Sequence, residues 1–215
     1  MLAFAAMIVS ILVALPAGII SAVKRQKPAD YAAMTFALLG ISLPEFWFGI
    51  MLILAFSLWL RWLPSMGYLS PLESFFGSLK FLILPAIALG LRMAGVVTRM
   101  TRSSMLDELG QDYVRTARAK GLPERTVIIL HTLKNALIPT VTIVGLQFGT
   151  ILGGTVVIEM VFSWPGVGQL LVEGILTRDY LVVQAAVLFI SCSFVIVNFF
   201  VDFFYTILNP RVGLE

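Results

Sequence analysis

The chain has 215 residues, of which 59% are hydrophobic and only 13% are charged, and its mean hydropathy is +0.97. Soluble domains carry roughly a quarter charged residues, so this composition excludes a soluble domain and indicates an integral membrane protein. The net charge of +3 would suggest a nucleic-acid partner in a soluble chain. Here the positions of the basic residues give a better explanation, and we expect no nucleic-acid binding.

Five apolar stretches are long enough to cross a bilayer, which takes about 20 residues of helix. They cover about residues 2–23, 31–60, 81–97, 137–157 and 181–205. The second is interrupted by Leu43-Pro44-Glu45, and proline removes a backbone hydrogen bond and bends a helix. The sequence therefore predicts an all-α, polytopic transmembrane bundle of five spans that forms one domain over residues 1–215.

The basic residues gather on one side of these spans, which the positive-inside rule makes cytoplasmic. That side holds Lys24, Arg25, Lys27, Arg99, Arg102, Arg115, Arg118, Lys120, Arg125, Lys134 and Arg211. Only Arg61, Lys80 and Arg178 lie on the other side. This orientation places Met1 outside, and it predicts that a further span, absent from this chain, precedes it.

The longest cytoplasmic segment contains a basic amphipathic stretch over about residues 112–136. Tyr113 to Lys120 has no Gly or Pro and predicts a short helix. Gly121 is well placed to end that helix, and Leu122-Pro123 predicts a turn. A second helix is expected to start near Glu124.

One face of the first predicted helix carries small residues. Tyr113, Ala117 and Gly121 are spaced i, i+4, i+8, so they share a side of the helix. The two small residues would let the backbone of another protein approach closely. Arg115 and Arg118 add positive charge around this face.

This stretch resembles the cytoplasmic EAA loop of permease subunits in binding-protein-dependent ABC importers. RTARAKGL, followed by HxLxNAxxP with the single His131, is closest to the dipeptide and oligopeptide branch. Arg115 and Thr116 stand where the Glu and Ala of the EAA pattern would be, a departure usual for the peptide branch. The resemblance extends to RMTRSSMLDELGQDY, FSWPGVGQLL and the terminal NPR. The alternative is a basic loop that only sets topology.

In that family the loop is a coupling helix that docks in a groove on an ATPase subunit. The resemblance implies this docking role for Tyr113, Arg115, Thr116, Ala117, Arg118, Lys120, Gly121 and Leu122. It also implies a second permease subunit, two ATPase subunits, an extracytoplasmic substrate-binding protein and a multi-pass place in a prokaryotic inner membrane.

No cofactor is expected on this chain. The GxxxxGK[ST] phosphate-binding loop is absent from the sequence, so ATP and Mg are expected on the partner ATPase. No metal-ligand cluster or catalytic triad is recognisable either, so we expect a transport subunit without catalytic residues. The lone His131 is interpreted as a structural or docking residue.

Gly145, Gly149 and Gly153 repeat every four residues in the fourth span, a pattern that lets helices meet closely in lipid. They predict helix packing, either within the chain or against a second permease. Gln147 lies between two of them and could face a helix or a pore.

Charged groups at membrane depth are costly unless they are paired or hydrated. Arg92, Asn198 and Asp202, with Gln147, are the candidate pathway or gate residues, and Asp202 is a candidate charge partner for Arg92. Structural pairing near the interface is the alternative, and Glu45 is the third ionisable residue at this depth. On the outside, Trp164 in FSWPGVG predicts a turn with an interfacial aromatic, at the outer mouth or as a surface anchor.

Together these features predict a permease subunit of a peptide-type importer. A secondary transporter or channel driven by an ion gradient is the alternative, and a membrane scaffold that recruits a partner through the same loop is a third reading. Permeases of this kind carry dipeptides, oligopeptides, glutathione or nickel chelates, and the sequence does not choose among them.

Overall fold

A computed structural model describes residues 1–152 and 155–208, excepting the side chains of residue 202 and residues 204–208. Every regular element in these ranges is a helix, which confirms the all-α prediction. Gly153, Arg211 and the side chain of Asp202, all named in the sequence analysis, lie outside the described residues.

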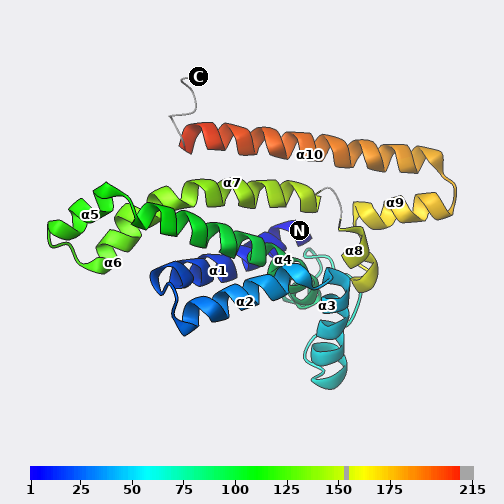
Figure 1. Cartoon of the computed structure of the whole chain (residues 1–215). Coiled ribbons are helices and arrows are strands. Elements are labelled where there is room, and N and C mark those ends of the chain that lie inside the picture. The colour runs from blue at the N-terminus through cyan, green and yellow to red at the C-terminus, as the bar shows by residue number, and fades with distance from the viewer. Residues whose placement is uncertain (153–154, 209–215) are drawn as a thin grey trace.

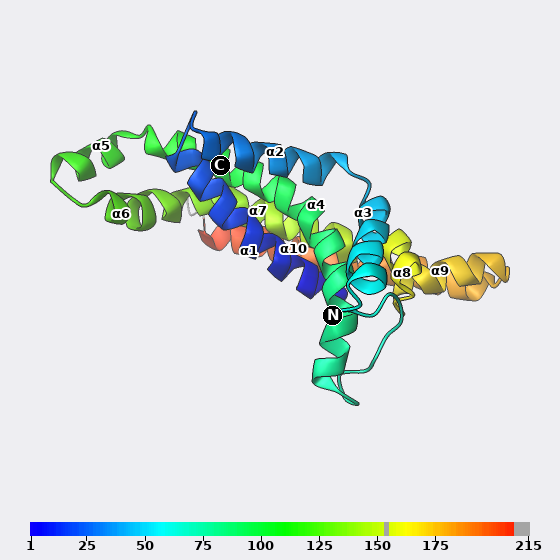
Figure 2. The same cartoon turned by 90° about the horizontal axis from the view of Figure 1, so that it is seen from below.

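Helix α4 (Phe75–Leu109) is the centre of the bundle (Figures 1 and 2). Its 35 residues are about 52 Å long at 1.5 Å per residue, more than the roughly 30 Å of a hydrocarbon core. The predicted span 81–97 is therefore only the middle of a helix that is longer than a membrane span and continues toward α5.

Helix α1 (Leu2–Val23) packs along α4 through small residues. A Cβ on Gly18 would lie 2.7 Å from the Cβ of Thr101, and a Cβ on Gly90 would lie 2.8 Å from the carbonyl oxygen of Ala6. Any larger side chain at these two positions would push the helices apart. The same close contact joins α2 (Pro28–Ser42) to α4, where a Cβ on Gly95 would meet the carbonyl of Ala37 at 2.5 Å.

The second predicted span is two helices that meet at a corner. Helix α2 ends at Ser42, and α3 (Glu45–Leu52) continues into a π-helix, η1 (Ile53–Trp59). The two halves differ in direction by 104°. Pro44 disfavours the helical region for the residue before it, and Leu43 is extended at φ −79° and ψ 131°. The proline thus produces a corner where the sequence predicted a kink.

The chain then passes from α4 through α5 (Asp112–Ala119), α6 (Glu124–Thr126) and the π-helix η2 (Val127–Thr132) into α7 (Leu133–Leu152). Helices α5 and α6 project from one end of the bundle (Figure 1). Helix α7 lies between α4 and α10 (Tyr180–Leu208) and packs on both.

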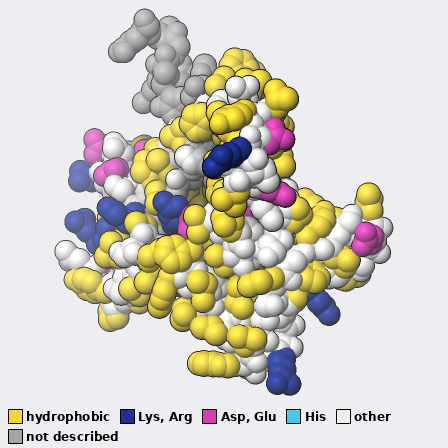
Figure 3. Space-filling view, turned by 90° about the vertical axis from the view of Figure 1, so that its right-hand side faces the viewer, with side chains coloured by type: hydrophobic (Ala, Val, Ile, Leu, Met, Phe, Trp, Pro, Cys, Tyr) yellow, Lys and Arg dark blue, Asp and Glu magenta, His cyan; other side chains and the backbone are white. Residues whose placement is uncertain are grey.

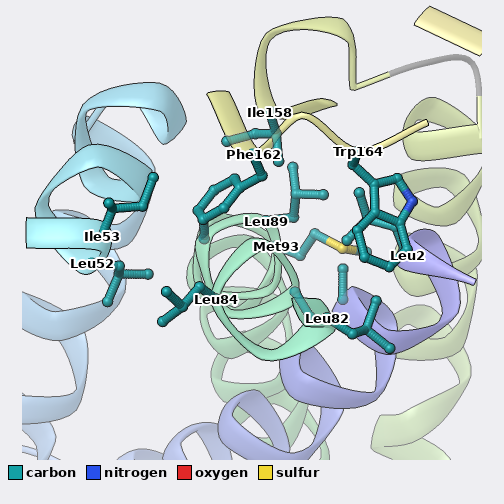
Figure 4. Close-up of a cluster of buried hydrophobic side chains, with 13 residues drawn as sticks. Leu2, Leu52, Ile53, Leu82, Leu84, Leu89, Met93, Ile158, Phe162 and Trp164 are labelled. Atoms are coloured by element: carbon teal, nitrogen blue, oxygen red, sulfur yellow. The ribbon is translucent and has the colours of Figure 1, made fainter. Parts of the chain in front are cut away.

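Helices α8 (Val156–Phe162) and α9 (Val167–Leu176) meet at 88° around the turn that contains Trp164. The indole is only 5% exposed and belongs to a buried cluster with Leu2, Leu82 and Phe162, drawn from α1, α4 and α8 (Figure 4). The expected surface anchor is therefore wrong, because Trp164 is a core residue of the bundle. The sequence pattern indicated no helix between the predicted spans 137–157 and 181–205, where the structure has most of α8 and all of α9.

Four helices are long and apolar enough to cross a membrane, and the number rises to six if each bent pair counts as one span. The predicted number of five lies within this range. Much of the surface in Figure 3 is hydrophobic, and Leu12, Leu188 and Phe199 on α1 and α10 are each at least 66% exposed. Such extensive apolar surface fits contact with lipid.

Candidate functional site

A hairpin at the basic end of the bundle joins α4 to α7. It comprises α5, a turn at Gly121 and the α6–η2 segment. Gly121 has φ +75°, a conformation that L side chains rarely adopt, and, apart from its chain neighbours, no described residue comes within 4 Å of the position of an added Cβ. This confirms the short helix, the glycine turn and the second helix at Glu124 that the sequence predicts.

The inside of the hairpin is a small apolar contact between its two arms. Val114 and Ala117 of α5 pack against Val127 of η2, and all three are at most 6% exposed. Ala117 is therefore covered by its own chain. This corrects the expected open face, because the small side chain lets the two arms of the hairpin approach.

Tyr113 is 38% exposed, and its hydroxyl connects three elements. Its Oη donates to Oε2 of Glu108 at 2.5 Å and accepts from Nδ2 of Asn135 at 3.1 Å. It also lies 3.4 Å from the carbonyl oxygen of His131. Burial, and then the neighbouring Glu108 carboxylate, raise the pKa of the Tyr113 phenol above its ordinary value. The phenol thus joins the end of α4 and the start of α7 to α5.

An ion pair joins the two arms of the hairpin beside the turn at Gly121. Nη2 of Arg118 donates to Oε1 of Glu124 at 2.7 Å, and Nε donates to Oε2 at 3.2 Å. This pairing raises the pKa of the Arg118 guanidinium. Arg118 thus supports the shape of the hairpin, which the sequence could not distinguish from docking.

The remaining predicted docking residues form an exposed surface, which we call the hairpin face. It consists of Arg115, Thr116, Lys120, Gly121 and Leu122, all exposed. Among the described residues, the Arg115 side chain contacts the exposed Asp112 at 3.4 Å and forms no other ion pair. Internal packing of the chain therefore leaves a basic surface with one apolar side chain, Leu122, which is 37% exposed.

An ion pair that sequence reasoning missed joins α2 to α4 near the hairpin. Asp30 in the first turn of α2 is 3% exposed and accepts two hydrogen bonds from Arg102 of α4. The Ser21 hydroxyl and the Gln26 backbone N–H also donate to it. One signal was available, since Asp30 is the first acidic residue of the chain and follows Lys24, Arg25 and Lys27.

Two of the candidate pathway residues line one cavity. This cavity of about 320 Å³ lies between α2, α3, α4 and α7, and its walls include Arg92 and Gln147. Nη1 of Arg92 donates to Oε2 of Glu45 at 2.9 Å. Arg92 thus pairs with Glu45 at the α2–α3 corner, and its expected pairing with Asp202 rests on a side chain outside the described residues.

Asn198 lies on the other side of α7, in its contact with α10. A Cβ on Gly149 would be 3.2 Å from Oδ1 of Asn198, and a Cβ on Gly145 would be 2.5 Å from Cγ2 of Val201. Both glycines therefore face α10 of the same chain. Asn198 is separated from Arg92 and Gln147 by the body of α7.

The fold and the two sites define a class of protein. A polytopic helical bundle with a polar cavity among its spans and an exposed hairpin at its basic end is a membrane transport subunit. The chain belongs to the family described as "Binding-protein-dependent transport system inner membrane component", whose model matches residues 14–214.

Relatives in this family carry peptide-related names. The chain is 45% identical to the di/tripeptide transport system permease protein DppB of Pseudomonas aeruginosa, covering 98% of this chain and 69% of the relative. It is also 45% identical to the glutathione transport system permease protein GsiC of Escherichia coli K12, covering 98% of this chain and 66% of the relative. The chain thus spans about two thirds of the length of these curated relatives.

A solved structure shares the fold at low identity. It is the MetNI methionine ABC transporter in inward-facing conformations, with a TM-score of 0.78 and 17% sequence identity over 97% of this chain and 91% of the other. This likeness confirms the architecture of the bundle.

Proposed function

We propose that this chain forms the membrane pathway of an ATP-driven importer for small peptides or similar solutes, and that its hairpin face docks on a separate ATPase subunit. The observation that carries the proposal is the division of the hairpin into a packed inside and an exposed basic face. Val114 and Ala117 are packed between the arms and the Tyr113 hydroxyl is hydrogen-bonded within the chain, whereas the residues of the hairpin face are exposed in the described structure.

The hairpin is connected to both long helices that line the cavity. Helix α4 runs without a break from Phe75 to Leu109, directly ahead of α5. Tyr113 bonds to Asn135 near the start of α7. A displacement of the hairpin by ATP-driven closure of its partner would therefore move the helices that carry Arg92 and Gln147, and so change access to the cavity.

The remaining parts of the importer are proposed from the family. ATP and Mg bind the ATPase subunits, of which two serve a pair of permease subunits, and an extracytoplasmic binding protein delivers the solute. The complex is placed in a prokaryotic inner membrane with the hairpin in the cytoplasm. The similarity to a di/tripeptide permease and a glutathione permease supports a small peptide substrate.

A pair of matched substitutions tests the docking face. Leu122→Asp places a charge at the apolar position of the face, whereas Leu72→Asp makes the same change at a 97% exposed leucine in the loop before α4. In the reconstituted importer, Leu122→Asp should abolish co-purification of the ATPase subunits and ATP-dependent uptake into proteoliposomes. Leu72→Asp should keep the ATPase subunits bound.

The opposite result is equally informative. If Leu122→Asp leaves ATPase binding and uptake intact, the hairpin face is not the docking surface. If uptake proceeds without ATPase subunits and follows an ion gradient, the chain is a secondary transporter.

A further inference from the structure

We propose that the cavity beside Arg92 is a subsite for a small zwitterionic peptide, with Arg92 binding its terminal carboxylate and Glu45 its terminal ammonium. This inference rests on the proposed transport function and names the chemistry that the pathway recognises. It assigns both members of the ion pair a direct contact with the solute.

The position of the pair calls for an explanation. Arg92 lies at the middle of α4, and a charge at the centre of a membrane helix costs about 2.5–3.5 kcal/mol on insertion scales. Pairing with Glu45 reduces this cost, but the side chains remain 60% and 21% exposed. A purely structural pair at this depth would be expected to be packed more deeply in the protein.

The polar groups of the cavity retain unused hydrogen-bonding capacity. Within the described part of the chain, Arg92 bonds only through Nη1, which leaves Nε and Nη2 free. Glu45 uses only Oε2, and the side-chain amide of Gln147 makes no bond to the described residues. The planar guanidinium of Arg92 can therefore donate hydrogen bonds to a second carboxylate, while Oε1 of Glu45 can accept one from a cation.

The charges favour a ligand with two opposite ends. Arg92 and Glu45 cancel each other, so a simple anion or cation would be attracted by one and repelled by the other. A short peptide near neutral pH carries a carboxylate and an ammonium, which complement both. When the peptide binds, Arg92 and Glu45 would weaken their ion pair with each other and form ion pairs with the two ends of the peptide.

The surrounding walls fit the rest of such a molecule. The cavity of about 320 Å³ is at the lower end of the usual range of about 300–1,000 Å³ for small-ligand sites. A second cavity of about 210 Å³ shares Glu45 and Arg92 and is otherwise lined by apolar side chains, including Phe36, Leu39 and Phe48. The ion pair thus stands beside an apolar space that can hold a side chain of the peptide.

Competition binding tests the assignment directly. The purified permease–ATPase complex, without binding protein, is loaded with radiolabelled Ala-Ala and challenged with Ala-Ala, Ala-Ala amide or N-acetyl-Ala-Ala. In the wild type, Ala-Ala should compete at least tenfold better than either blocked form. Arg92→Gln should remove the preference over the amide, and Glu45→Gln the preference over the acetylated form.

Matched controls separate the subsite from a general charge effect. Arg99→Gln removes the same charge from an exposed position of α4, and Glu73→Gln does so in the outer loop. Both should keep the wild-type preferences. Arg92→Lys keeps the charge and loses the planar fork, so it should keep the complex assembled and bind Ala-Ala more weakly than the wild type.

Three results would overturn the subsite. The wild type could show no preference among the three compounds, Arg92→Gln and Glu45→Gln could keep the wild-type preferences, or Arg92→Lys could separate the permease subunits on size exclusion. The proposed importer function fails by a different measurement, the absence of ATP-dependent uptake by the complete complex. Intact ATP-dependent uptake by the wild-type complex, together with wild-type ligand preferences in Arg92→Gln and Glu45→Gln, would therefore reject only the subsite.

Discussion

Arg102 and Asp30, which lie 72 residues apart in the sequence, form a two-point ion pair with Nε–Oδ1 and Nη2–Oδ2 distances of 2.8 and 2.9 Å. Because Asp30 is buried and Arg102 is three-quarters covered, this pair is not a surface contact. It fixes the α1–α2 turn to α4 just ahead of the hairpin.

Asp30→Asn should destabilise the protein by about 3 kcal/mol, because removing one partner leaves the guanidinium without its counter-charge in a largely covered site. The check is denaturation of the purified protein in detergent, followed by size exclusion. Asp112→Asn removes the same charge from the exposed contact with Arg115 and should change the midpoint little. Equal effects of the two substitutions would contradict the special role of Asp30.

Ala117→Trp should open the hairpin, because the indole cannot fit between Val114 and Val127. Overpacking of this kind costs about 1–3 kcal/mol. Limited trypsin digestion should then cut faster within residues 115–125, which contain four basic residues. Ala119→Trp, at an exposed position of the same helix, should leave the digestion pattern unchanged.

Gly145→Ala should weaken the contact between α7 and α10, because the new Cβ would lie 2.5 Å from Cγ2 of Val201. Combining it with Val201→Ala should recover part of the loss, so the two changes will not be additive. Thermal denaturation in detergent of the two single variants and the double variant measures this coupling. Gly110→Ala serves as the control, because its Cβ would lie at an ordinary 3.5 Å from the carbonyl oxygen of Asp107.

The Tyr113 phenol should titrate above its ordinary pKa of about 10, because burial and the Glu108 carboxylate oppose its ionisation. With the pKa raised in the folded protein, the stability that the phenol contributes is complete below about pH 10 and is lost as pH rises through the folded value. Tyrosinate absorbance of the wild type minus that of Tyr113→Phe isolates this transition. Glu108→Gln should move it to lower pH, and an unchanged midpoint would contradict the contact.

The sequence predicted the helical class, the hairpin and its glycine turn, because these depend on local composition and on residues such as Gly121 and Pro123. It did not show which side of α5 turns inward. Periodicity placed Tyr113, Ala117 and Gly121 on one face, but only the position of Val127 after the turn shows that Ala117 is covered.

Long-range contacts explain the other differences. Arg92 pairs with Glu45 because the corner at Pro44 turns α3 toward α4, and a pattern within one span cannot reveal that geometry. Trp164 is buried because α8 returns to the core, where Leu2 and Leu82 meet it. The docking and pathway roles themselves stay predictions.

The π-helix η2 determines how far α7 is rotated about its own axis relative to the hairpin. Each α-helical residue advances the chain by about 100°, so losing a single residue from Val127–Thr132 would turn everything after it by about that angle. Asn135 would then move away from Tyr113, and Gln147 would rotate out of the cavity wall. The wide π-helical turn therefore orients α7 so that Asn135 meets the hairpin while Gln147 faces the cavity.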